Sequence, residues 1–198
     1  MKPVLVAISM DFLLVAIFSI SQQELASTAF AEPREGVDIC KAEILPVTVQ
    51  DRLKQEFSSW TIQKPLGLSL NARKRWDSEK PVQCPGIAAG RFENTKSFSY
   101  AVLLVAQDHA DAGYKLLVFS PKPGQPYEMR VLDSGENESP NFFIHTVPMS
   151  KFFDNESRRK FQAYTSYGIL FVDAAEQEYE VDVYFWANGT YRHQPIDY

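Results

Sequence analysis

The sequence predicts a β-dominated α+β domain, in which an antiparallel meander sheet carries one short helix near its N-terminal end. Three observations favour this class. One apolar stripe of four residues at helical spacing is followed by a long series of short apolar segments. The connections between these segments are short and polar. Aromatic residues reach 13% of the chain, which favours strands. Because consecutive strands joined by short turns pair with each other, an antiparallel arrangement is expected.

The helix is predicted to begin at Leu45-Pro46, since proline suits the first helical position. Leu45, Val49, Leu53 and Phe57 recur every four residues and form one apolar face. A strand at residues 60–62 follows. Residues 63–85 contain four breakers, so loops and one short strand near residues 66–70 are expected there.

The later strands are predicted from apolar runs and from alternation with period two. Residues 98–106 are apolar on both faces, so this strand should be central and covered on both sides, with the helix as one cover. Asn188-Gly189 is a strong hairpin signal. The predicted strands are 86–92, 98–106, 114–119, 127–132, 142–147, 168–172, 179–186 and 190–193.

The N-terminus predicts export. Lys2 is followed by an almost unbroken apolar run over residues 4–20, and Ala29-Phe30-Ala31 is a cleavage site of the signal-peptidase type. Asp11 inside the run leaves an uncleaved membrane anchor as the alternative. The expected organisation is a signal peptide at 1–31, a flexible lead-in at 32–44 and a single β-rich domain at 45–198. The mature protein is expected to be periplasmic or secreted, without a membrane span.

The two cysteines agree with export. Cys40 and Cys84 both follow the predicted cleavage site, and an even pair in an oxidising compartment is usually a disulfide. Neither belongs to a C-x-x-C motif, so zinc is not indicated. The bond would be worth on the order of 4 kcal/mol in the chain-entropy model.

Charge argues against a nucleic-acid partner. The formal net charge is -5, and the basic residues form two short clusters, Arg73-Lys74-Arg75 and Arg158-Arg159-Lys160. Nucleic-acid binding usually needs a broad basic face, so these clusters are expected in solvated loops.

The sequence indicates no catalytic residues, metal ligands or cofactor. His109, His145 and His193 are scattered, without a second histidine or a carboxylate at metal-ligand spacing. His109 does lie between Asp108 and Asp111, but in a segment that has the composition of a hairpin turn.

One candidate binding patch lies on the strand at 179–186. Alternation places Glu178, Glu180, Asp182, Tyr184 and Trp186 on one face. If the two aromatics are exposed, this face is an aromatic and acidic recognition surface. The alternative interpretation is a solvated outer face whose charges discourage aggregation between strands.

Several blocks resemble small exported bacterial proteins that are loosely similar to FG-GAP/VCBS-like modules. The resemblance implies export and a β-rich fold, and it implies no activity. In such modules an Asp-rich loop often holds calcium, whereas the equivalent residues 93–97 offer one carboxylate, Glu93, and a lysine, Lys96, so calcium is not expected. The blocks are Cys84-Pro85-Gly86-Ile87-Ala88-Ala89-Gly90-Arg91-Phe92, Ser99-Tyr100-Ala101-Val102-Leu103-Leu104 and Tyr184-Phe185-Trp186-Ala187-Asn188-Gly189-Thr190-Tyr191, with Leu45-Pro46, Phe57, Trp60 and Tyr167-Gly168-Ile169.

These observations favour an exported cell-envelope binding protein that acts through a protein surface, with an immunity or inhibitor role as a concrete version. A hydrolase with an unrecognised active site and a structural envelope component are the alternatives. An enzyme would require a histidine and a carboxylate brought together in one cleft. The sequence leaves the partner and the oligomeric state open.

Overall fold

The computed structural model places every described element in one compact unit, Glu35–Tyr198. The predicted signal peptide and nearly all of the predicted lead-in lie outside the described residues. The structure describes residues 40, 44–79, 83–93, 96–107, 113–136, 141–154, 156–157, 165–175 and 179–196.

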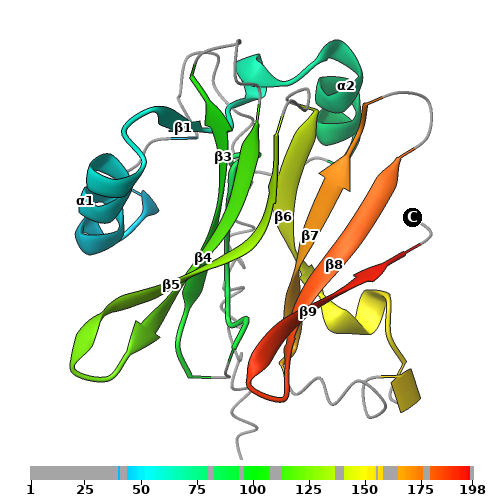
Figure 1. Cartoon of the computed structure of the whole chain (residues 1–198). Coiled ribbons are helices and arrows are strands. Elements are labelled where there is room, and N and C mark those ends of the chain that lie inside the picture. The colour runs from blue at the N-terminus through cyan, green and yellow to red at the C-terminus, as the bar shows by residue number, and fades with distance from the viewer. Residues whose placement is uncertain are drawn as a thin grey trace, which may run out of the picture. The chain divides into compact units, whose positions relative to one another are not determined.

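The fold is β-dominated and antiparallel, which confirms the predicted class. Its strands form two sheets (Figure 1). Sheet A contains β1 (Trp60–Ile62), β2 (Ile87–Gly90), β3 (Ser99–Ala106), β4 (Tyr114–Lys122) and β5 (Gln125–Gly135). Sheet B contains β6 (Phe142–Pro148), β7 (Tyr167–Asp173), β8 (Glu180–Ala187) and β9 (Thr190–Pro195).

Most strands pair with the next strand in the sequence. In sheet A, β3 pairs with β4 and β4 with β5, while β1 and β2 both pair with β3. Sheet B has the order β6-β7-β8-β9. The β8–β9 hairpin turns at Asn188 and Gly189, whose φ angles of 52° and 77° confirm the predicted two-residue turn.

The two sheets pack face to face. Alternate residues of sheet A, such as Ala101, Leu103 and Leu116, meet Ile144 and Phe171 of sheet B in one buried cluster. The opposite side of sheet A is covered by α1 (Val47–Glu56), whose Val49 is fully buried against Val102 and Leu104. β3 is therefore covered on both sides, as its sequence predicts.

A second helix, α2 (Leu70–Glu79), covers the outer side of sheet B. The sequence predicts loops and a strand here, so this expectation is wrong. The helix begins where the Ser69 hydroxyl accepts a hydrogen bond from the Ala72 amide at 3.3 Å. Only Ala72 and Trp76 of the helix are buried, so its apolar stripe is too narrow to stand out among the breakers around it.

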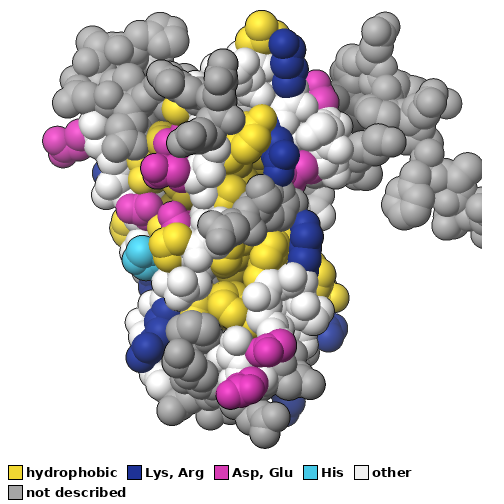
Figure 2. All heavy atoms as spheres, turned by 90° about the vertical axis from the view of Figure 1, so that its right-hand side faces the viewer, with side chains coloured by type: hydrophobic (Ala, Val, Ile, Leu, Met, Phe, Trp, Pro, Cys, Tyr) yellow, Lys and Arg dark blue, Asp and Glu magenta, His cyan; other side chains and the backbone are white. Residues whose placement is uncertain are grey.

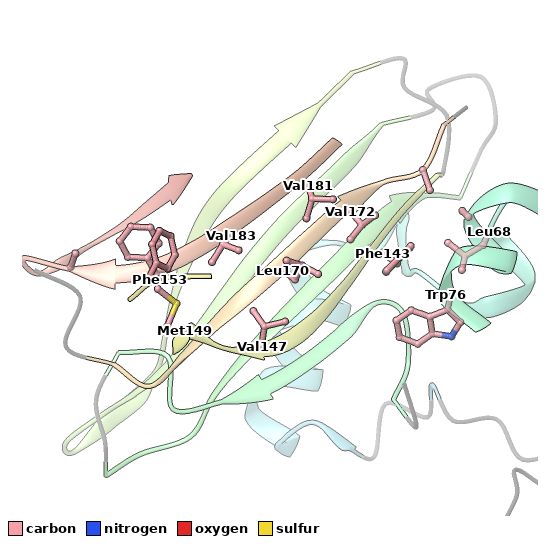
Figure 3. Packing of buried hydrophobic residues seen from close by; sticks show 14 residues of the cluster. Leu68, Trp76, Phe143, Val147, Met149, Phe153, Leu170, Val172, Val181 and Val183 are labelled. Atoms are coloured by element: carbon pink, nitrogen blue, oxygen red, sulfur yellow. The ribbon is translucent and has the colours of Figure 1, made fainter. Parts of the chain in front are cut away.

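The outer side of sheet B is capped at two ends (Figure 3). Leu68 and Trp76 lie at one end of the buried cluster and Met149 and Phe153 at the other, with strand residues such as Leu170 between them. Met149 belongs to the short helix η4 (Met149–Lys151). Figure 2 shows hydrophobic side chains gathered along the middle of this face.

The two sheets are joined by direct hydrogen bonds at one corner. At this corner, the Ile144 amide donates to the Pro85 carbonyl at 2.8 Å and the Thr146 hydroxyl to the Ala89 carbonyl at 2.9 Å, so β6 runs beside β2. Strand order then places β5 and β9 at the opposite sides of their sheets. We call the region where β5 faces β8 and β9, away from this corner, the seam.

Candidate functional site

The predicted disulfide is present. Cys40 and Cys84 are bonded, with a sequence separation of 44, and both side chains are buried against the outer face of sheet A. The bond thus fixes the segment before α1 to the start of β2. Its role is structural.

The predicted binding patch on β8 does not form one exposed surface. Glu180 is exposed and Asp182 is partly exposed, whereas Tyr184 is only 5% exposed. Glu178 lies outside the described residues. Tyr184 must therefore be removed from the candidate patch, because a side chain this buried cannot meet a partner.

Tyr184 is buried because both faces of β8 are covered. Val183 and its alternate neighbours face the α2 side, and Tyr184 faces sheet A. Its hydroxyl donates to Asp133 Oδ2 of β5 at 2.8 Å, and Tyr114 of β4 donates to the same oxygen at 3.1 Å. Burial, followed by the hydrogen bond to Asp133, raises the pKa of Tyr184 above its ordinary value. The sequence shows alternation on β8 but gives no sign that a second sheet covers this face.

Trp186 is half-buried and packs at the seam. The Arg130 guanidinium lies 5.1 Å from its ring centroid, and Tyr191 meets it edge to face at 5.1 Å. Trp186 thus packs β8 against β5 and β9, and these contacts explain its position as a packing residue.

A polar cluster fills the seam beside Trp186. Glu93 accepts hydrogen bonds from the Ser120 hydroxyl and from Arg130 Nη1, the latter at 2.7 Å. Burial raises the pKa of Tyr191, and the nearby Glu93 carboxylate raises it further. The seam keeps a small cleft of about 170 Å³, lined by Arg130, Val131, Leu132, Tyr184, Thr190, Tyr191, Arg192 and His193.

Two histidines pair with carboxylates. His193 Nδ1 lies 3.4 Å from Asp182 Oδ1 at the mouth of the seam, and its ring stacks on Tyr184. His145 Nε2 lies 2.9 Å from Glu79 Oε2, where α2 meets β6. His109 lies outside the described residues.

A larger groove of about 330 Å³ lies between α1 and the β1 side of sheet A. The apolar lining comes from Leu53 and Phe57 at the end of α1, Trp60 and Ile62 of β1, and Leu104 of β3. Gln50, Lys54, Ser58, Thr61 and Gln107 supply the polar lining.

The groove residues are held in place by local bonds. The Trp60 amide donates to the Phe57 carbonyl at 3.0 Å, which fixes the turn from helix to strand. The Gln107 side chain donates to the Trp60 carbonyl at 3.3 Å, and Lys115 Nζ lies 4.7 Å from the centroid of the Trp60 ring. Phe57 and Trp60 are half-buried, so each retains surface for a ligand. The sequence predicts Phe57 on the helix stripe but contains no signal that the stripe ends beside a groove.

Metal-binding chemistry is not indicated in the described part of the chain, where no group of three His, Cys, Asp or Glu side chains could hold an ion. Among the same residues, no helix is long and apolar enough to cross a membrane.

No family model matches the chain, and no curated protein or solved structure is similar to it. The resemblance to FG-GAP/VCBS-like modules therefore stays a prediction.

Proposed function

We propose that the chain is an exported binding protein of the cell envelope that holds a segment of another protein in the groove beside α1. An immunity or inhibitor role, in which the bound segment belongs to a toxin or hydrolase, is the concrete version. The observation that supports this function is the groove itself, with half-buried Phe57 and Trp60 beside a polar rim.

The lining of the groove suits the binding of apolar side chains from a partner. Its volume of about 330 Å³ falls in the range of ligand-binding clefts, and such clefts are mostly apolar with a few polar groups that set orientation. Aromatic side chains that keep some exposed surface are frequent anchors in protein interfaces. The groove therefore offers a seat for one or two apolar side chains of a partner.

The charge at the groove determines which residues are favoured next to those apolar side chains in the partner. Lys54 is the charged residue of the lining, and Lys115 lies against Trp60. Both are cations in a chain of net charge -5. An apolar partner segment with neighbouring carboxylates is thus favoured over a basic one.

The test begins with affinity capture of the tagged chain from the envelope of its own source. Binding of each captured protein is then titrated against variants of the groove. Ser58→Trp should weaken binding about tenfold or more by filling the groove, since Ser58 is exposed and lines it.

Charge is tested by a matched pair on α1. Lys54→Gln and Gln55→Glu each change the net charge by the same amount, but Gln55 does not line the groove. We expect Lys54→Gln to weaken binding and Gln55→Glu to leave it unchanged. A partner that binds both Ser58→Trp and Lys54→Gln as tightly as the parent would exclude the groove as its site.

A hydrolase is the second candidate, and the pairing of His193 with Asp182 favours it. A carboxylate that orients an imidazole is half of an acid–base unit, and the cleft beside it could admit a small substrate. Activity lost in His193→Gln and kept in His145→Gln, in a screen of ester, peptide and glycoside substrates, would support this candidate. A screen without turnover, or turnover that survives His193→Gln, would exclude it.

A further inference from the structure

Two leucine side chains at the α2 end of the molecule are highly exposed to solvent. Leu66 is 86% exposed and Leu70 is 69% exposed, and no large hydrophobic side chain in the described ranges is more exposed than these two. Leu66 belongs to the short helix η2 (Pro65–Gly67) and Leu70 begins α2. They lie four residues apart in sequence, on a protruding turn rather than in a groove.

The turn is held so that the leucines cannot fold back onto the core. Leu68, between them, is 5% exposed and packs in the cluster on sheet B. Trp76 anchors the other end of α2 edge to face against Phe143, with ring centroids 5.3 Å apart. Arg73 Nε donates to the Pro65 carbonyl at 3.0 Å, which ties α2 to η2. Because the anchor positions are filled, the exposure of Leu66 and Leu70 is built into the packing.

The surroundings of the leucines are basic. Residues 64–79 contain four cations, Lys64, Arg73, Lys74 and Arg75, against two carboxylates, Asp77 and Glu79, although the whole chain is acidic. Arg75 is bonded to Glu79 at 3.0 Å. Lys74 is exposed and lies one turn after Leu70, on the same side of α2. Figure 2 shows hydrophobic, basic and acidic side chains next to one another at the upper end, where α2 lies in Figure 1.

We propose that Leu66 and Leu70, flanked by Arg73 and Lys74, form a docking tip for the surface of a membrane that contains anionic lipids. The leucines enter the headgroup boundary while the cations meet lipid phosphates and carboxylates. Peripheral binding of this kind combines buried apolar area with attraction to anionic lipids.

The shape and charge of the tip favour a lipid surface over a protein. Protein interfaces are broad patches whose centres are depleted of lysine, whereas here two protruding leucines are bordered by cations. The proposal is independent of the groove beside α1, which lies on the other sheet, so the two can fail separately.

The experiment measures co-sedimentation of residues 35–198 with lipid vesicles. This compact unit holds every described helix and strand, the three buried clusters and the disulfide. It also omits residues 4–20, whose apolar run would bind lipid by itself. Vesicles of phosphatidylcholine alone are compared with vesicles that also contain phosphatidylglycerol, at roughly millimolar lipid.

We expect binding to the anionic vesicles, weakened by salt, and about tenfold less binding to the neutral ones. Leu66→Ser with Leu70→Ser should lower the partition by about tenfold or more. Lys74→Gln should lower it roughly fivefold, and Lys54→Gln, the same change on α1, should leave it unaltered. Val131→Ser, at an exposed valine of β5, is the matched apolar control.

Urea unfolding of each variant establishes that it is folded. No binding to the anionic vesicles, or equal binding by the double leucine variant and Val131→Ser, would overturn the proposal. Equal binding to neutral and anionic vesicles would overturn it as well. If the double leucine variant instead loses a captured envelope protein while vesicles do not bind, the tip is a protein interface.

Discussion

The hydroxyl of Tyr184 should be a measurable link between the two sheets. It donates to Asp133 at 2.8 Å from sheet B, while Tyr114 donates to the same carboxylate at 3.1 Å from sheet A. A hydrogen bond to a charged group contributes about 1.5–3 kcal/mol. Since this site is only partly buried, we expect Tyr184→Phe to lower the free energy of unfolding by about 2 kcal/mol.

The assay is urea unfolding followed by far-ultraviolet circular dichroism. With a slope of about 2 kcal/mol per molar urea for a domain of this size, the midpoint should fall by about 1 M. Tyr167→Phe is the control, because Tyr167 is 42% exposed, and it should stay within about 0.5 kcal/mol of the parent. In an Asp133→Asn background, the loss caused by Tyr184→Phe should shrink to half or less.

Alkaline pH provides a second measurement of the same link. Burial and the hydrogen bond to Asp133 raise the pKa of Tyr184 above the ordinary value of 10.0, so the folded state resists its ionisation. The stability that this group contributes is complete below pH 10 and is lost as the pH rises toward its folded-state pKa. The parent should therefore lose stability above pH 10 more steeply than Tyr184→Phe. An equal loss for Tyr184→Phe and Tyr167→Phe, or an undiminished loss in Asp133→Asn, would refute the reasoning.

Three further predictions concern the rest of the fold. Replacing Cys40 and Cys84 by serine should lower the free energy of unfolding by about 4 kcal/mol, measured by urea unfolding, and an unchanged midpoint would contradict this. Burial mainly, and the charge of Glu180 in addition, raises the pKa of Asp173, so its ionised form destabilises the fold. Asp173→Asn should therefore raise the melting temperature at pH 7, with a gain that shrinks as the pH falls toward the ordinary carboxyl pKa of 3.8 and is absent below it. An equal gain at pH 7 and below pH 3.8 would count against this cause. Trp76→Ala should cost about 3–5 kcal/mol, and a loss below 1 kcal/mol would mean that α2 contributes little to the packing of sheet B.

The strands could be predicted from the sequence because each has its own local signal. Residues 98–106 are apolar on both faces, and the structure covers β3 on both sides. Asn188-Gly189 predicts its turn because few other dipeptides adopt two positive φ angles. These features depend on neighbouring residues alone.

The division into two sheets could not be predicted in the same way. Whether β5 pairs with β6 or ends a sheet depends on how the whole surface is buried, and Tyr184 shows the consequence. Its alternation with Val183 is typical of a strand with one wet face, yet a second sheet covers that face. The groove beside α1 was likewise hidden, because Phe57 and Trp60 look like ordinary core residues until the packing of the helix end is known.

The two sheets come from separate stretches of chain, and this has a consequence for the order of folding. Sheet A, α1 and the disulfide lie between residues 40 and 135, and sheet B between 142 and 195. A chain that emerges from its N-terminus can complete the hydrogen bonds of sheet A while one side of that sheet still lacks its cover. During this interval α2 has been made but the sheet that it packs on has not. A chaperone that shields bare sheet surface would be needed most at that stage, and least once the β8–β9 hairpin closes the seam.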